Sequence, residues 1–249
     1  MEASSRVLRE REFHNQRFAD DSEREGRVRR FYDAIAYGFE LFRTRVLEQA
    51  RDRCVLEYGC GAESLAFDLG GHAKEVVGID ISDVAIARAK QTAHGRQLQN
   101  VRFKLDNAEA MSLPAASVDV VAGSGIVHHL DIARSMRELR RVLRPGGVAI
   151  FAEPMGHNPI VNWYRRRTPQ LRTPDEHPLL QRDLAAMKQS FKGSQVTYFG
   201  LIAPALGVFS RHADPTSRIT RAVWALDRLL CSFPPLGRHA WFCIIELRA

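Results

Sequence analysis

Short apolar runs alternate along this chain with longer segments in which apolar residues recur every three or four positions. The runs have the length of β-strands, whereas the periodic segments are typical of amphipathic helices. Strands are predicted near residues 53–58, 75–80, 101–105, 118–122 and 148–152. The helices predicted between them lie near residues 64–71, 83–95 and 131–143. This alternation indicates βαβ units and therefore a mainly parallel sheet.

The segments that flank this alternating region have different patterns. Residues 1–49 are predicted to form an N-terminal helical arm or lid, in which a charged stretch precedes one or two amphipathic helices. Residues 153–178 are rich in Pro, His and Arg, and we expect them to form an irregular substrate loop. A helix and a strand near 195–201 follow this loop. Residues 205–238 are predicted as a helical insertion interrupted by prolines, and 240–247 as the last strand.

The composition agrees with a soluble enzyme that has one large core. The chain has 249 residues, of which 45% are hydrophobic, so residues 50–249 are expected to form a single α/β domain. No apolar run reaches about 18 residues, so no membrane span is expected. The charged N-terminus lacks the apolar stretch of a signal peptide, which indicates a cytoplasmic location. The four cysteines form no C-x-x-C pair, which indicates a reducing compartment without a zinc site.

The net charge of +7 raises the question of an anionic partner. Charges nearly balance over residues 1–30, and the arginines between 134 and 144 follow helical spacing, as on a solvated helix face. Nucleic acid is therefore not the expected partner. The stretch from Ile219 to Leu230 combines apolar residues with arginines. Three roles are open for this stretch: it could contact a membrane surface, cover an apolar pocket or pack against the sheet. The oligomeric state is also left open.

The most informative segment is Val-Leu-Glu-Tyr-Gly-Cys-Gly at 55–61, where a buried strand runs into a glycine turn. An acid, Asp80, ends the next apolar run about 20 residues later, as in folds that bind the ribose of an adenosine cofactor. Ser64 stands where a dinucleotide fingerprint has its third glycine, and Glu57 would repel a pyrophosphate. A cofactor with an ammonium group and no phosphate fits better. These residues favour S-adenosylmethionine over NAD.

With this turn, the chain resembles the class I S-adenosylmethionine-dependent methyltransferases, and in particular the ubiquinone-methyltransferase-like group that acts on small molecules. Four further segments between residues 50 and 155 match in order. They are Val-Gly-Ile-Asp-Ile-Ser at 77–82, Asp-Asn-Ala-Glu at 106–109, the run 118–130 and Leu-Arg-Pro-Gly-Gly at 143–147. The resemblance implies a doubly wound, mainly parallel seven-stranded sheet whose antiparallel last strand lies between the fifth and sixth. The chain departs from the family at Glu63, where the pattern has glycine.

The resemblance also implies which residues bind S-adenosylmethionine and its product, S-adenosylhomocysteine. The cofactor-binding candidates are Glu57, Gly59, Gly61, Asp80, Ile81, Asp106, Asn107, Ala108, Ser124 and Gly125. Glu57 and the glycines are expected at the methionine end, Asp80 at the ribose and the residues from 106 to 108 at the adenine. No three metal-ligand side chains share one element at ligand spacing, so we expect no metal cofactor.

The acceptor is expected at the carboxyl ends of the fourth and fifth strands, where open α/β sheets bind ligands. The candidate catalytic residues are His157, His128 and Glu153. His157 is the first candidate for a general base, because imidazole titrates near neutrality. The alternative for each of the two histidines is a structural role, in which the ring is packed in the core or hydrogen-bonded to the backbone. The substrate-binding candidates are Tyr32, His129, Tyr164, Arg165, Arg166 and His177.

Together these features predict a methyltransferase that acts on a small-molecule acceptor, either anionic or partly apolar. A biosynthetic metabolite or a lipid-like compound would have this chemistry. Two alternatives stay open. One is a nucleic-acid methyltransferase, whose binding would fall steeply with salt. The other is a cofactor-binding protein with a regulatory role and no catalysis, which Glu63 in place of glycine suggests.

Overall fold

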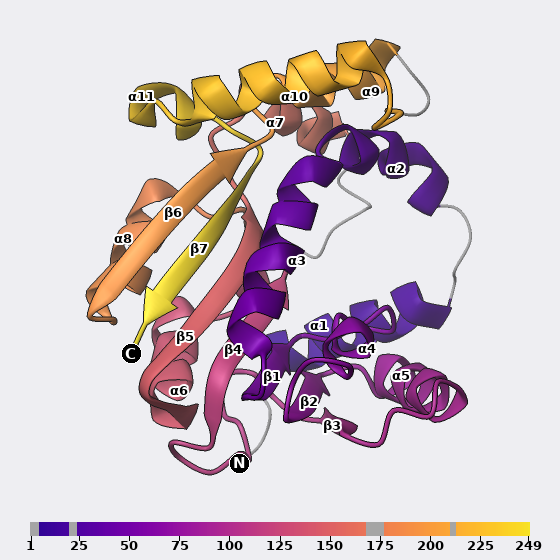
Figure 1. Ribbon diagram of the computed structural model, residues 1–249, viewed down its shortest axis with the longest axis vertical. Coiled ribbons are helices and arrows are strands. Elements are labelled where there is room, and N and C mark those ends of the chain that lie inside the picture. The colour runs from indigo at the N-terminus through magenta and orange to yellow at the C-terminus, as the bar shows by residue number, and fades with distance from the viewer. Residues whose placement is uncertain (1–4, 20–23, 168–176, 210–212) are drawn as a thin grey trace.

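The computed structural model describes residues 5–19, 24–167, 177–209 and 213–249, and in this part of the chain seven strands form one sheet in the order β3-β2-β1-β4-β5-β7-β6 (Figure 1). The strands are β1 (Cys54–Tyr58), β2 (Glu75–Asp80), β3 (Val101–Leu105), β4 (Val118–Ser124), β5 (Leu143–Pro154), β6 (Gly193–Phe199) and β7 (Phe242–Arg248). Strands β1 to β5 pair in parallel. Strand β7 lies antiparallel between β5 and β6. The predicted sheet and the place of its last strand are confirmed.

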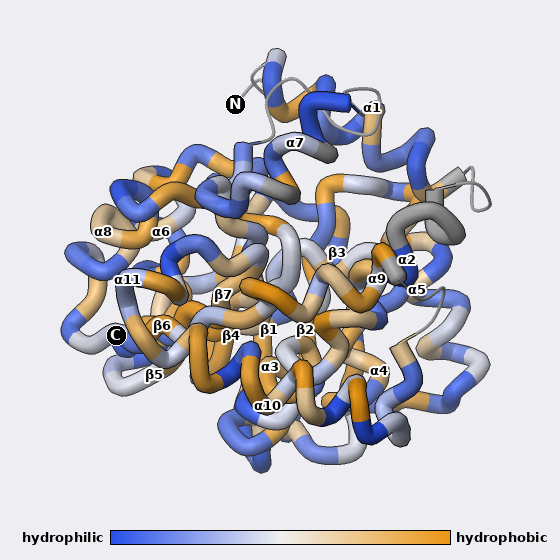
Figure 2. Tube along the Cα trace, turned by 90° about the horizontal axis from the view of Figure 1, so that it is seen from above, coloured by the Kyte–Doolittle hydropathy of each residue, from blue (hydrophilic) through white to orange (hydrophobic). Residues whose placement is uncertain are grey.

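Helices cover both faces of this sheet, which is why its strands read as nearly continuous apolar runs. One face carries α3 (Ala36–Ala50), α4 (Ala66–Leu69) and α5 (Asp83–Gly95), and the other carries α6 (Ile132–Val142) and α8 (Gln181–Gln189). Figure 2 shows hydrophobic residues concentrated along the strands and hydrophilic residues along the outer helices. Each face thus has its own apolar core.

The strand order reverses beside β1. From β1 the chain continues outward through β2 and β3, and it then returns to add β4 and β5 on the other side of β1. In such sheets the ligand lies outside the carboxyl ends of the two strands at the reversal. Those ends are Tyr58 of β1 and Ser124 of β4, which precede the two predicted glycine turns.

The N-terminal segment folds as three helices, in agreement with its predicted helical character. Helices α1 (Ser5–Ala19) and α2 (Arg24–Ala34) precede α3. Helix α3 packs on the sheet with the buried residues Phe42 and Val46. Helix α1 contacts α5 and the turns at the end of the strands.

The segment after β5 is more regular than its composition predicts. Helix α7 (Pro159–Arg167) occupies the start of the predicted irregular loop, so that prediction is wrong for these residues. The reason is local, because Asn158 Oδ1 accepts a hydrogen bond from the Val161 N–H at 3.0 Å and caps the helix. Pro159 follows as the first helical residue, where a missing N–H costs nothing. Residues 168–176 of this loop lie outside the described residues.

The region before β7 is helical with proline breaks, as expected. It contains η3 (Ala203–Ala205), α9 (Leu206–Phe209), α10 (Arg218–Cys231) and α11 (Pro234–Gly237). Helix α10 lies across the end of the sheet at which β6 finishes (Figure 1). Its buried Asp227 accepts hydrogen bonds from the Tyr37 hydroxyl and from the backbone N–H of Gly200 at 2.9 Å. No helix in the described part of the chain is long and apolar enough to cross a bilayer.

Candidate functional site

The turn after β1 is held by the buried carboxylate of Glu57. The Ser64 hydroxyl donates to it, and the backbone N–H groups of Leu65 and Ala66 donate at 2.8 and 2.9 Å. Glu57 therefore ties the glycine turn to the first turn of α4. Burial raises the pKa of this carboxyl to about 7, although the three hydrogen bonds act in the opposite direction. Oε1 accepts only the bond from Leu65 and retains a lone pair, and the expected contact with a cofactor ammonium stays a prediction.

Gly59 and Gly61 adopt φ angles of 72° and 56°, in the left-handed region that favours glycine. A Cβ at Gly59 would lie 2.7 Å from the side chain of Ile126. Asp80 accepts hydrogen bonds from the backbone N–H groups of Gly61 and Ser82, both at 2.8 Å. Each carboxylate oxygen accepts one of these bonds and retains a lone pair for a further donor. The residues present thus fit an adenosine cofactor whose ribose hydroxyls donate to Asp80.

The loop after β3 carries the predicted adenine contacts. Asp106 accepts hydrogen bonds from the hydroxyl and the backbone N–H of Ser112, and Asn107 Oδ1 accepts from a backbone N–H two residues further on at 2.9 Å. The Tyr58 hydroxyl donates to the Ala108 carbonyl at 2.6 Å. These bonds fix the course of the loop, and the adenine role stays a prediction. The remaining predicted cofactor residues follow the neighbouring strands: Ile81 after β2, and Ser124 and Gly125 at the end of β4.

Glu153, near the end of β5, organises the turn after β4 and is fully buried. Its Oε1 accepts hydrogen bonds from the backbone N–H groups of Ile126 and Val127, both at 2.9 Å. Its Oε2 lies 2.8 Å from Nδ1 of His128, in the short helix η1 (Val127–His129). The structure thus brings together two of the predicted catalytic residues. A carboxylate on Nδ1–H orients the imidazole and leaves its basic lone pair on Nε2.

Helix α1 lies over the turns that follow β1 and β2. The Phe18 ring is 3.4 Å from the position that a Cβ at Gly61 would occupy. Asn15 Oδ1 accepts a hydrogen bond of 2.6 Å from the Ser82 hydroxyl, and Asn15 Nδ2 donates to Asp83 at 2.9 Å. Ser82 is also the N-cap of α5. The helix therefore borders the place where Asp80 would meet a ribose.

The same helix reaches the turns after β3 and β4 through Arg6. Its guanidinium forms an ion pair with Glu109 and donates to the His129 carbonyl at 2.6 Å. Glu109 is buried and also accepts from the Asp131 N–H at 2.7 Å. Sequence reasoning missed the two contacts of Arg6, since they join residues more than a hundred positions apart. The high charge of the first helix was a signal for these contacts, but it was interpreted as typical of a solvated arm.

Aromatic side chains gather beside the end of β5. The ring of Tyr32 in α2 lies 5.3 Å from the Trp241 ring and 6.0 Å from the Phe39 ring, measured between centroids. The Trp241 carbonyl accepts a hydrogen bond of 2.7 Å from the N–H of Met155, which directly follows β5. Tyr32 is 43% exposed. Tyr32 therefore packs against Trp241, whose carbonyl is bonded to Met155, two residues beyond Glu153, and its substrate role stays a prediction.

The other substrate candidates lie on either side of residues 168–176. The His177 N–H donates to the His128 carbonyl at 3.2 Å, which brings this segment back beside η1. Arg165 and Arg166 lie in α7, where Arg166 is exposed and Arg165 half-buried. The side chain of Tyr164 lies outside the described residues. Binding of an anionic acceptor by the arginines stays a prediction.

His157 occupies a different environment from the one its predicted catalytic role requires. Its Nε2 accepts a hydrogen bond of 3.1 Å from the backbone N–H of Gln181 at the start of α8. Burial and then the neighbouring His239 lower the pKa of its imidazole. None of its contacts within the described residues involves His128 or Glu153. The catalytic roles of His128 and His157 both stay predictions.

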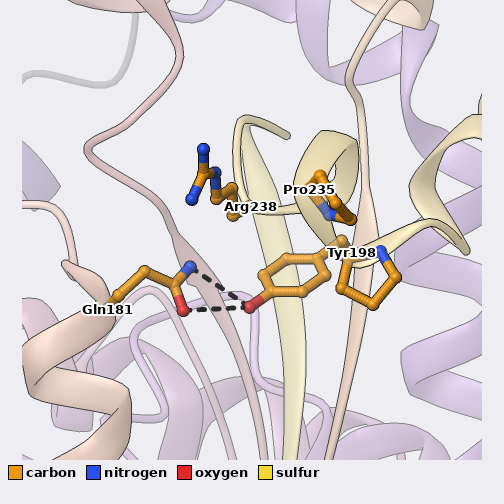
Figure 3. Close-up of a pocket in the computed structure, with 5 residues that line it drawn as sticks. Gln181, Tyr198, Pro235 and Arg238 are labelled. Carbon is orange, nitrogen blue, oxygen red and sulfur yellow. Dashed lines mark hydrogen bonds between the residues drawn. The ribbon is translucent and has the colours of Figure 1, made fainter.

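A surface hollow of about 360 Å³ opens beside this histidine. Figure 3 shows the amide of Gln181 turned toward the Tyr198 hydroxyl, with Arg238 and Pro235 on the other side of the opening. The lining residues are Gln181, Tyr198, Pro234, Pro235 and Arg238. None of them belongs to the glycine turns, to Asp80 or to the pair formed by Glu153 and His128. This hollow is therefore separate from the candidate site.

Comparison with known proteins agrees with this geometry. A family model described as a methyltransferase domain matches residues 56–151, which run from β1 into β5. A demethylmenaquinone methyltransferase of Chlorobaculum parvum is 33% identical over 118 residues, which are 46% of this chain and 47% of that protein. An uncharacterized methyltransferase of Bacillus subtilis is 25% identical over 146 residues, 58% of this chain and 57% of that protein. The chain spans about half the length of the curated relatives it matches.

Solved structures extend the likeness beyond the matched domain. A geranyl diphosphate C-methyltransferase of Streptomyces coelicolor, solved with Mg²⁺, geranyl diphosphate and S-adenosylhomocysteine, covers 99% of both chains at a TM-score of 0.69. Its sequence is 14% identical, so this likeness concerns the fold. Residues 56–151 thus match a methyltransferase domain, and the strand order, with the glycine turn facing Asp80, gives this chain the fold of the solved methyltransferases.

Proposed function

We propose that the protein transfers a methyl group from S-adenosylmethionine to a small, partly apolar acceptor. One structural relationship carries this proposal. The glycine turn with Asp80 and the pair formed by Glu153 and His128 lie at the same edge of the sheet, on either side of the strand reversal. A cofactor site thus adjoins a group that can accept a proton.

When bound, S-adenosylmethionine supplies a methyl group activated by a sulfonium. Asp80 holds the ribose, and the turn at Gly59 and Gly61 lets the backbone approach the methionine end. Helix α1, which we assign as the lid, excludes water above these groups. Methyl transfer would require the acceptor within about 3–3.5 Å of the methyl carbon, and these residues would hold the cofactor ready for that approach.

His128 is the candidate base for the acceptor proton. Because Glu153 accepts from Nδ1–H, the lone pair of the neutral imidazole lies on Nε2. After proton transfer, the buried carboxylate stabilises the imidazolium. Glu153 itself is a positioning residue, since its two oxygens hold η1 and the imidazole. Such a base contributes about 10²–10⁴-fold to a rate.

The acceptor class follows from the surroundings of the site. Tyr32 and Trp241 give the acceptor edge an aromatic wall that suits an apolar body. A relative and a fold neighbour are named for demethylmenaquinone and geranyl diphosphate, and both of these acceptors join a polar head to an apolar part. Arg165 and Arg166 of α7 are the residues that would meet an anionic head. A lipid-like acceptor with a polar head is therefore our choice.

Helix α10 supports the same class of acceptor, because its outer surface is apolar. The exposed fractions of Ile219, Leu226 and Leu229 are 72%, 48% and 57%. Arg218 and Arg221 are exposed at the start of the same helix. A basic helix with an apolar face suits the surface of an anionic membrane, where lipid-like acceptors reside.

The decisive experiment measures cofactor binding and methyl transfer separately. Calorimetry should show binding of S-adenosylhomocysteine and none of NAD. Labelled methyl groups should then pass to a prenylated quinol or an isoprenyl diphosphate, and not to a mixed-sequence RNA or DNA. Labelling of nucleic acid alone would replace this proposal with the nucleic-acid alternative. Cofactor binding without transfer to any of the tested classes would favour a regulatory protein.

A further inference from the structure

Three metal-ligand side chains converge where helix α1 meets the turn after β4. Glu10 and His14 lie one helical turn apart in α1, and His129 ends η1. One ligand atom from each residue lies within 4.8 Å of the other two. Glu10 Oε2 is 3.1 Å from His129 Nδ1 and 3.5 Å from His14 Nε2. The expectation that no metal binds considered donors on a single element, whereas these donors come from two.

The spacing of these atoms suits a tetrahedral metal ion. Zinc lies about 2.0–2.2 Å from imidazole nitrogen and carboxylate oxygen, so ligand atoms around it are about 3.3–3.5 Å apart. The distance of 3.5 Å from Glu10 to His14 agrees with this range, and that of 3.1 Å to His129 lies just below it. A small movement of the His14 side chain, which is 16% exposed, would complete the set.

The burial of His129 is a second, independent observation that supports a metal site. His129 is 7% exposed, and within the described residues its Nδ1 makes no hydrogen bond, although it lies 3.1 Å from Glu10 Oε2. A ring with its hydrogen on Nδ1 would aim that N–H at the oxygen. A metal ion instead requires the lone pairs to converge on a point between the atoms. The His129 ring is fixed in place, since it packs against His128 with centroids 4.2 Å apart.

We propose that Glu10, His14 and His129 bind a transition-metal dication, with Zn²⁺ as the preferred ion. Two imidazoles and one carboxylate suit zinc and its neighbours, whereas Mg²⁺ and Ca²⁺ prefer oxygen ligands. Three protein ligands leave a fourth position for water or another ligand. The ion would join α1 to the turn that carries His128 and so fasten the lid. This role as a clamp rests on the proposed function, whereas the binding itself does not.

The test uses the full chain without an affinity tag, treated with a chelator and titrated with ZnCl₂ in the absence of cofactor. Calorimetry and metal analysis should give one Zn²⁺ per chain. His14→Ala and Glu10→Gln should each weaken binding by more than about 100-fold, because loss of a ligand exceeds the effect of losing an outer contact. His72→Ala, which changes an exposed histidine outside the cluster, should bind as the wild type does. Circular dichroism verifies that each variant is folded.

Equal affinity in His14→Ala and the wild type would overturn the site, as would a wild type that takes up no zinc. Binding of Mg²⁺ in preference to Zn²⁺ would also overturn it. Hydrogen exchange then tests the clamp. Zinc should slow exchange of the amides in α1 of the wild type and leave those of His14→Ala unchanged. Bound zinc without slower exchange would overturn the clamp. Because neither measurement involves S-adenosylmethionine, failure of the proposed function would be seen separately.

Discussion

Glu153 Oε2 accepts a hydrogen bond of 2.8 Å from His128 Nδ1, and both side chains are buried. The pair joins β5 to the turn after β4, where we propose that the acceptor meets the cofactor. Because the other carboxylate oxygen already holds two backbone N–H groups, Glu153 has little freedom to move. The orientation of the imidazole is therefore fixed by the fold.

The first prediction concerns this pair. His128→Gln should lower kcat by about 10²–10⁴-fold if the imidazole removes the acceptor proton. Glu153→Gln should lower kcat and move the acid limb of the pH profile, since a neutral amide no longer stabilises an imidazolium. Affinity for S-adenosylhomocysteine should change little in either variant. Steady-state kinetics over pH, combined with calorimetry, provides the measurement.

His157→Ala is the informative comparison for this prediction. His157 bonds to the backbone of α8, so its loss should leave kcat close to that of the wild type. A fall of 10²-fold or more in this variant, with His128→Gln fully active, would return the role of base to His157. Full activity in both variants would indicate an acceptor that needs no base.

The second prediction concerns the cofactor. Asp80→Asn should weaken binding of S-adenosylhomocysteine by about 1.5–3 kcal/mol, the range for hydrogen bonds to a charged group. The amide keeps an acceptor oxygen for only one of the backbone N–H groups of Gly61 and Ser82, so circular dichroism must verify that the variant is folded. Calorimetry measures the change. Glu63→Gln, at an exposed position of the same turn, should bind as the wild type does. Unchanged affinity in Asp80→Asn would remove this residue from the ribose site.

The third prediction is a pH dependence of stability from Glu57. Burial raises the pKa of its carboxyl from 4.5 to about 7, so the folded protein binds a proton more tightly than the unfolded chain does. This group therefore stabilises the fold below about pH 4.5, and its contribution is lost as the pH rises through about 7. The full difference amounts to about 3 kcal/mol. Relative to Glu57→Gln, the wild type should lose stability between pH 5 and pH 8.

Urea denaturation at both pH values measures this difference, and comparison with the variant cancels the titration of all other groups. Glu63→Gln is the matched control, since it neutralises an exposed acid in the same turn. The prediction would be contradicted if the difference in unfolding free energy between the wild type and Glu57→Gln were the same at pH 5 and pH 8.

The sheet could be predicted from sequence because each parallel strand carries its own signal. Continuous apolar runs such as 118–122, bounded by glycine or polar residues, mark strands buried on both faces. The glycine turn and Asp80 were found for the same reason, since spacing along the chain determines their positions. The prediction that failed was the irregular loop after the fifth strand. Asn158 and Pro159 were interpreted as loop residues, although this pair also begins a helix.

Contacts between distant segments gave no usable signal in the sequence. Glu10 and His129 are brought together only by the placement of α1. Nothing in the sequence indicates that Glu57 also holds the start of α4. Asp227 lies in the middle of an apolar helix pattern, where an acid suggests a solvated position. The fold instead buries it. Charged residues acquire such roles through tertiary structure, which pattern analysis does not describe.

The fourth prediction concerns the buried carboxylate of Asp227. It accepts hydrogen bonds from the Tyr37 hydroxyl and from three backbone N–H groups, at 2.9, 2.6 and 2.7 Å. Asp227→Asn replaces one acceptor oxygen with a donor that faces other donors, so it should destabilise the protein by about 3 kcal/mol or more. Asp68→Asn is the control, since the exposed pair with Arg43 should contribute less than about 1 kcal/mol. Equal urea midpoints for the two variants would contradict the assigned role.

The fifth prediction concerns membrane contact by the outer face of α10. The protein should bind vesicles that contain phosphatidylglycerol, and binding should weaken with salt and with neutral lipid, because arginines accompany the apolar residues. Leu226→Asp combined with Leu229→Asp should weaken binding at least about tenfold, since two exposed leucines would no longer enter the interface. Ser194→Asp combined with Gln195→Asp makes the same charge change at exposed positions of β6 and should bind normally. Vesicle flotation measures both variants. If both lose binding equally, charge alone holds the protein to the vesicle and the apolar face of α10 has no part in it.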